Sequence, residues 1–124
     1  MKIKCGTDII EIDRIKESIE SLGEKFLRKV FTENEIKYCE SKKAQKYQHY
    51  AARFAAKEAV FKAISESLTN KFLLGWCDYE ILNDETGKPN VKIRGINIEN
   101  IENIDLSISH CKKYAVATAI AIYK

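Results

Sequence analysis

The sequence predicts an α+β fold in which antiparallel strands pack against one long helix, and two observations support that prediction. Residues 45–68 are rich in alanine and contain neither glycine nor proline, which favours a single uninterrupted helix. Residues 114–123 alternate alanine with larger side chains, the period of two that is typical of a strand. A length of 124 residues suits one domain, so we expect a single domain over residues 1–124.

The first third of the chain predicts one strand and two helices. Residues 2–10 indicate a strand, with Gly6 giving its backbone extra freedom. The next helix should carry an apolar stripe made of Ile12, Ile15, Ile19, Leu22 and Phe26. Gly23 is expected to interrupt or cap this helix. Thr32 and Glu35 have the spacing of a capping box, which predicts that another helix begins there.

The last third predicts strands. Residues 79–82 and 91–93 flank a turn rich in polar residues, which is typical of a hairpin. Residues 106–109 alternate leucine and isoleucine with serine before a tight loop at residues 110–113. Alanine occupies four successive positions on one face of the final strand: Ala115, Ala117, Ala119 and Ala121. We therefore expect both faces of this strand to be covered, with the small face allowing the long helix to approach closely.

Composition and charge exclude several classes of protein. Hydrophobic residues make up 45% and charged residues 31%, as in a soluble globular chain. The formal net charge of +3 is too mild to favour a nucleic-acid partner. The N-terminus is too polar for a signal peptide, and the longest apolar stretch, residues 114–123, is too short to span a bilayer as a helix. We expect a cytoplasmic protein without a membrane partner.

The cysteines predict free thiols rather than a metal finger or a disulfide scaffold. They are Cys5, Cys39, Cys77 and Cys111. No two of them have the spacing of a zinc-binding pair, and a chain of this length needs no disulfide to stabilise its core.

Two carboxylates stand out as candidates for chemistry. Asp8 lies at the end of a strand that appears buried by its composition, where it either caps the next helix or binds a ligand. Glu58 lies on the long helix beside Phe54 and Phe61, and its simplest role is an ion pair with Lys62 one turn away. If that face is covered, Glu58 needs a stronger partner, and a hard cation is one.

Cations follow the same helix. Arg53, Lys57 and Lys62, beside two candidate carboxylates, indicate a site for phosphates bridged by Mg²⁺, which prefers one or two carboxylates together with water and phosphate oxygens. His110, at a strand end, is either simply exposed or a phosphate donor or proton carrier. The residues alone thus predict a magnesium–phosphate site of undefined substrate.

These residues lie in stretches that resemble the small holo-acyl-carrier-protein synthases of the 4′-phosphopantetheinyl transferase superfamily. The resemblance covers nearly the whole chain. Its motifs are residues 6–14 (GTDIIEIDR), 31–39 with Phe31, Thr32, Glu35, Tyr38 and Cys39, 53–63 (RFAAKEAVFKA), 76–81 (WCDYEI), 87–89 (GKP) and 106–110 (LSISH). The ordered set at this spacing is far more specific than any one motif.

The resemblance implies a role for each matching residue. Asp8 and Glu58 would hold Mg²⁺, and Lys62 would contact the phosphates and assist the leaving group. Arg53 and His110 would contribute to coenzyme A binding. For the acyl carrier protein, Arg14 would face its acidic helix, and from charge alone we add Lys25, Arg28 and Lys29 to this basic surface. The family also implies a homotrimer with sites between subunits.

The implied reaction moves 4′-phosphopantetheine from coenzyme A to a serine of apo-acyl carrier protein, releases adenosine 3′,5′-bisphosphate, and supports fatty acid biosynthesis. As base for the serine proton we expect a water held by the metal and Glu58. This chain departs from the family at Ser65-Glu66-Ser67, where a glycine-rich loop is usual, and at Cys111, where a small hydroxyl or an acid is usual.

Two alternatives belong to other classes. A non-catalytic trimeric module that binds carrier protein or coenzyme A would need no metal carboxylates. A magnesium-dependent pyrophosphohydrolase would cleave coenzyme A with water and no protein acceptor.

Overall fold

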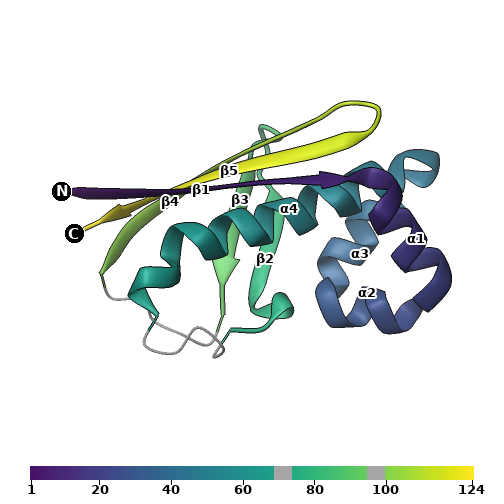
Figure 1. The fold of residues 1–124 in the computed structure, drawn as a ribbon, viewed down its shortest axis with the longest axis horizontal. Coiled ribbons are helices and arrows are strands. Elements are labelled where there is room, and N and C mark those ends of the chain that lie inside the picture. Colours follow the sequence, from purple (N-terminus) through teal and green to yellow (C-terminus); the bar gives the residue numbers. More distant parts are fainter. Residues whose placement is uncertain (69–73, 95–99) are drawn as a thin grey trace.

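The computed structural model describes residues 1–68, 74–94 and 100–124, and it has the expected α+β architecture (Figure 1). A three-stranded antiparallel sheet covers one side of the long helix α4, and a two-stranded hairpin packs beside them. The sheet has the strand order β1 (Lys2–Glu11), β5 (Tyr114–Tyr123), β4 (Ile101–His110). The hairpin consists of β2 (Tyr79–Asn83) and β3 (Pro89–Ile93).

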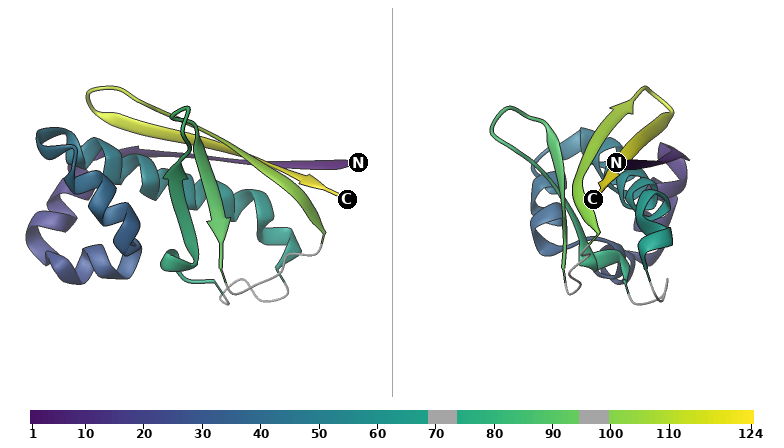
Figure 2. Two further views of the ribbon diagram at one scale, coloured as in Figure 1. Left: turned by 180° about the vertical axis from the view of Figure 1, so that it is seen from behind. Right: turned by 90° about the vertical axis from the view of Figure 1, so that its left-hand side faces the viewer.

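The helices divide into one long element and a cluster of short ones. Figure 2 shows the short helices at the end of the molecule where α4 begins, opposite the two chain termini. They are α1 (Ile12–Leu22), α2 (Glu24–Val30) and α3 (Glu33–Glu40). The long helix α4 spans Lys46–Ile64, with single 3₁₀ turns before it (Lys43–Gln45) and after it (Ser65–Ser67). In the part of the chain described, no helix has the length and apolarity needed to cross a bilayer.

Two local predictions about the short helices are confirmed. Gly23 ends α1 with φ at 60°, a conformation that glycine adopts without strain, and its N–H donates to the Ile19 carbonyl. Thr32 and Glu35 form the expected capping box at the start of α3. The apolar stripe is only partly core, because Leu22 is 57% exposed.

Small residues bring α4 against the sheet. The alanine face of β5 is fully buried, and Ala117, Ala119 and Ala121 belong to the same core cluster as Val60 and Ile64 of α4. Gly6 of β1 lies against the same helix, where a Cβ atom would collide with the Ala59 carbonyl oxygen and crowd Lys62. The expected role of Gly6 was wrong: close approach to α4, rather than backbone freedom, requires glycine here.

The other face of the sheet is open in the single chain, so the expectation that both faces of β5 are covered is not met within one copy. Ile120 is 39% exposed, and on β1 the side chains of Ile3 and Ile9 are more exposed still. Thr7 and Thr118 meet at the centre of this face, with their hydroxyls 3.2 Å apart.

Substituting Gly6 with alanine tests the close approach of β1 to α4. We expect Gly6→Ala to lower the free energy of unfolding by roughly 1–3 kcal/mol, because the added methyl meets helix backbone that cannot rotate away. Urea unfolding measures the loss. Lys2→Ala, at the exposed beginning of the same strand, is the control. A Gly6→Ala protein as stable as the control would contradict this explanation.

Candidate functional site

Strand β1 and helix α4 bring together the first group of predicted site residues. Lys62 Nζ lies 3.3 Å from Asp8 Oδ1 and donates to the Thr7 carbonyl oxygen at 2.9 Å. Glu58 lies one turn before Lys62 and is half-buried. The approach of β1 to α4 at Gly6 therefore places Asp8 beside Glu58 and Lys62, although about 50 residues separate them in the sequence.

The electrostatics of Glu58 show that the two carboxylates are close. Burial raises the pKa of Glu58, the negative charge of Asp8 raises it further, and Lys62 partly offsets both effects. In the described ranges, no third histidine, cysteine, aspartate or glutamate completes an all-protein metal cage. Two carboxylates in mutual repulsion fit a Mg²⁺ ion that keeps its remaining positions for water and phosphate oxygens. Asp8 and Glu58 are the residues that would hold it.

Arg53 lies in a second group, in which no carboxylate of the described residues contacts it. Arg53 is only 2% exposed. Its guanidinium group stacks on the ring of Tyr38, with the guanidinium carbon 4.1 Å from the ring centre. Its guanidinium donates a hydrogen bond to Asn83 Oδ1 at 3.5 Å, and its Nε has no partner among the described residues. A buried cation without an anionic partner is costly, so this arrangement suits an anionic ligand.

His110 joins this second group through a residue that the sequence analysis missed. The rings of His110 and His49 lie 6.1 Å apart between centroids, and His49 also packs edge-on against Tyr38. His49 precedes Arg53 by four residues on α4, and helical periodicity therefore places both on one face. That spacing was visible in the sequence, but the approach of β4 to the same face was not.

Lys57 does not belong with the other cations of α4. Its side chain is fully buried, and its Nζ donates to Glu35 Oε1 at 2.6 Å, to the Val30 carbonyl at 2.7 Å and to the Trp76 carbonyl at 3.0 Å. The grouping of Lys57 with Arg53 and Lys62 as phosphate contacts is corrected accordingly. Its amine is used within the protein, to fix α2, α3 and the turn at Trp76 against α4.

The residues at which the chain departs from the family pattern have local partners. Ser65–Ser67 form the 3₁₀ turn after α4, and the Ser67 hydroxyl donates to the Tyr123 hydroxyl at 2.6 Å. Cys111 is exposed in the loop between β4 and β5. Backbone N–H groups of Lys113 and Tyr114 lower the pKa of the Cys111 thiol.

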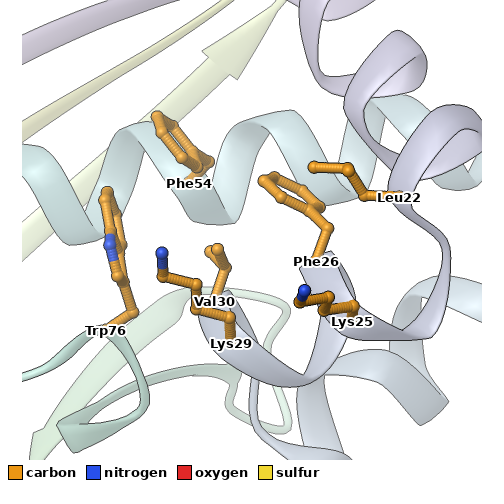
Figure 3. A pocket seen from close by; sticks show the side chains of 7 residues that line it. All are labelled: Leu22, Lys25, Phe26, Lys29, Val30, Phe54 and Trp76. Carbon is orange, nitrogen blue, oxygen red and sulfur yellow. The ribbon is translucent and has the colours of Figure 1, made fainter.

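A pocket of about 400 Å³ lies beside α1 and α2 (Figure 3). Most of its lining is apolar, and two lysines make it basic. Its lining residues are Leu22, Lys25, Phe26, Lys29, Val30, Phe54 and Trp76. Arg14 is exposed on α1, eight residues before Leu22. Arg28 lies outside the lining and pairs with Glu24 and Glu33, so part of its charge is already neutralised.

A second pocket of about 340 Å³ shares Trp76 with the first and includes Glu58 in its lining. It is lined by Lys57, Glu58, Phe61, Leu74, Gly75, Trp76 and Tyr79. Trp76 lines both pockets and stacks on Phe54 with ring centroids 4.7 Å apart. The carboxylate end of the site therefore opens next to the basic pocket.

Comparison with known proteins defines the class. The model of the 4′-phosphopantetheinyl transferase superfamily matches residues 4–119, and the chain belongs to this family. The predicted resemblance and the prediction of a transferase are thereby confirmed.

Within that family, the similar proteins are holo-[acyl-carrier-protein] synthases. The one from Ruminiclostridium cellulolyticum is 52% identical over 97% of this chain and 92% of its own length. The one from Protochlamydia amoebophila is 45% identical over 97% of this chain and 98% of its own.

Solved structures confirm the predicted fold. The Chronobacterium ammoniagenes synthase in complex with coenzyme A has a TM-score of 0.81 and 27% identity, covering 100% of this chain and 99% of that one. A synthase from Bacillus anthracis in complex with CoA (3′,5′-ADP) has a TM-score of 0.77 and 32% identity, covering 98% and 96%.

Replacing the buried lysine tests the structural role assigned to it. We expect Lys57→Met to lower the free energy of unfolding by about 3–5 kcal/mol, because Glu35 is left buried without its cation and two carbonyls lose a donor. Lys62→Met is the matched control on the same helix; its ion pair is half-exposed and should contribute less than about 1 kcal/mol. Urea unfolding at one protein concentration compares them. Equal losses would contradict the role of Lys57.

Proposed function

We propose that this chain, as one domain over residues 1–124, transfers 4′-phosphopantetheine from coenzyme A to a serine of apo-acyl carrier protein in a Mg²⁺-dependent reaction. The observation that carries the proposal is the presence of two different charged sites on α4. One has two carboxylates and a lysine, and the other has a buried arginine and no carboxylate. Membership in the family and the coenzyme A complexes of similar proteins support the choice of donor.

The two sites bind different phosphate groups of coenzyme A. The pyrophosphate contains the bond to be broken and belongs at Asp8, Glu58 and Lys62, where the two carboxylates would hold Mg²⁺ and Lys62 would contact the phosphate. The remaining phosphate is a monoester on the ribose, and Arg53 and His110 bind it directly. The phosphate monoester then accepts a hydrogen bond from Arg53 Nε, which has no partner among the described residues.

The reaction exchanges one phosphorus–oxygen bond for another. The serine oxygen bonds to the phosphorus that carries pantetheine, the bond from that phosphorus to the bridging oxygen breaks, and adenosine 3′,5′-bisphosphate leaves. Glu58 accepts the serine proton through a water, and Lys62 neutralises charge on the leaving phosphate. Mg²⁺, when bound, stabilises the negative charge that builds on the phosphate oxygens.

The carrier protein docks on the basic pocket beside α1 and α2. Lys25 and Lys29 border an apolar hollow, which suits a partner with an acidic helix and a protruding apolar side chain. Arg14 extends the positive surface along α1, and Arg28 adds to its edge. The adjoining pocket at Trp76 then leads from the docked carrier to Glu58.

The open face of the sheet is the surface on which three copies assemble. It exposes Ile3, Ile9 and Ile120, which a homotrimer would bury. A pocket of about 280 Å³ on this face is lined by Ile9 and Val116 together with His110. A neighbouring subunit covering the face would therefore reach the donor site, as expected for sites between subunits.

We place this activity in the cytoplasm, where it would supply holo-carrier protein for fatty acid biosynthesis. The supporting observation is that the cysteines of the described structure are all free thiols, which suits a reducing compartment.

Removing the metal-binding charge tests the reaction. With apo-carrier protein, coenzyme A and Mg²⁺, the wild type should add the mass of phosphopantetheine to the carrier. Asp8→Asn and Glu58→Gln should each slow this by roughly a hundredfold or more, because a neutral amide binds Mg²⁺ more weakly than a carboxylate does and does not act as a base. Intact-mass spectrometry follows the carrier.

The controls for these variants are their unfolding curves and oligomeric mass, which should match the wild type. No mass gain with the wild type would exclude the transferase and favour a binding module. Transfer at the wild-type rate by both variants would remove the carboxylates from the site.

Reversing a charge on α1 tests the docking surface. Arg14→Glu should raise the KM for carrier protein on the order of tenfold at low salt, less at high salt, and leave coenzyme A affinity unchanged. Arg28→Glu should have a smaller effect, since Glu24 and Glu33 already compensate that charge. Lys2→Glu, at the far end of β1, is the control. Equal losses of affinity for carrier and coenzyme A would refute the assignment of Arg14.

A further inference from the structure

His49 occupies a position between the groups assigned to the ribose phosphate. It is on the first turn of α4, half-buried, with its ring edge-on to Tyr38 at 5.6 Å and to His110 at 6.1 Å between centroids. Nothing in the proposed reaction uses it. Yet it lies in the same aromatic group on which the buried Arg53 is stacked.

The charged groups around His49 are all cationic. Arg53 faces it from α4, Lys42 from the turn after α3 and His110 from the end of β4, while Tyr38 on α3 contributes a neutral ring. Lys42 Nζ also lies 4.8 Å from the centre of the Tyr38 ring. No carboxylate perturbs His49 among the residues that the structure describes. Such a set attracts a phosphate dianion and gives it no competing anion.

We propose that His49 is a third contact for the phosphate monoester of coenzyme A, beside Arg53 and His110, and that it takes up a proton from solution when that phosphate binds. This inference rests on the proposed transfer function and names a residue that determines donor specificity. In the imidazolium form both ring nitrogens of His49 donate, whereas the neutral ring donates from only one. A dianion at this place therefore favours the charged form.

The electrostatics of the ligand-free protein agree with this geometry. Burial lowers the pKa of His49, and the charges of Arg53, Lys42 and His110 lower it further. These effects favour the neutral form of His49 in the ligand-free protein. A bound dianion offsets the three cations, which raises the pKa of His49.

The sign of the pH dependence follows from linkage. Because the pKa of His49 is higher in the complex than in the free protein, its contribution to affinity is complete below the free value. It is lost as pH rises from the free to the bound value. Each tenfold change in affinity across this window corresponds to about one pKa unit between the two states.

The experiment uses the full chain, which has only two histidines. Proton NMR of the imidazole Cε1–H resonances is recorded from about pH 5 to pH 8.5, with and without coenzyme A. The resonance absent from His49→Phe, a variant that keeps a ring between Tyr38 and His110, belongs to His49. We expect the pKa of His49 to be higher with coenzyme A bound, and to be unmoved by dephospho-coenzyme A, which lacks the monoester.

Affinities measured by calorimetry give a second readout. Wild type should bind coenzyme A on the order of tenfold more tightly than His49→Phe at the acid end, with the ratio falling toward one at the alkaline end. For dephospho-coenzyme A the two proteins should bind alike at every pH. Because phosphate ionisation affects both proteins equally, the ratio isolates His49.

The outcomes separate this inference from the proposed function. A wild type that transfers phosphopantetheine, yet whose His49 titrates identically with and without coenzyme A, overturns the inference and leaves the transferase standing. If the ratio of the coenzyme A affinities of wild type and His49→Phe is constant with pH, the inference is likewise overturned and the transferase stands. If His49→Phe fails to fold, His49→Gln assigns the resonance, and the wild-type titration still decides. A wild type that does not bind coenzyme A overturns both.

Discussion

The buried ion pair between Lys57 and Glu35 is the interaction on which the geometry of the site depends. Lys57 Nζ holds the end of α2 through Val30, the start of α3 through Glu35 and the turn at Trp76, all against α4. Glu35 in turn accepts the backbone N–H groups of Thr32 and Ile81, which ties β2 to the same point. Such a pair is costly to break, because either partner left alone is a buried charge.

These contacts fix the position of α4, and α4 carries the charged side chains of both candidate sites. Glu58 follows Lys57 directly, and Arg53 precedes it by one turn, so the helix carries one candidate phosphate site on either side of its anchor. The sheet determines how close β1 lies to α4. Gly6 and the alanine face of β5 allow the helix to approach closely, and this approach brings Asp8 to Lys62. Packing of the smallest side chains thus determines where the charged ones meet.

Local features could be predicted from the sequence, and distant contacts could not. The capping box at Thr32, the cap at Gly23 and the long helix depend on neighbouring residues, and the structure has them. Glu35 was visible only as a capping residue, and its pairing with Lys57 needs two elements to fold together. The contact between His49 and His110 likewise joins α4 to a strand end far along the chain. The residues alone predicted a magnesium–phosphate site with Asp8 and Glu58 as its candidate carboxylates, and the resemblance gave both the role of metal ligands. The structure brings the two side chains close together.

The central claim is that these two sites serve transfer to a protein serine rather than hydrolysis or binding alone. Its most direct test is the amount of adenosine 3′,5′-bisphosphate released from coenzyme A with Mg²⁺, measured with apo-carrier protein and with a carrier whose acceptor serine is alanine. The account predicts one molecule released per carrier modified, and none with the alanine carrier. Release that is equal with both carriers would show that water is the acceptor and would contradict the account.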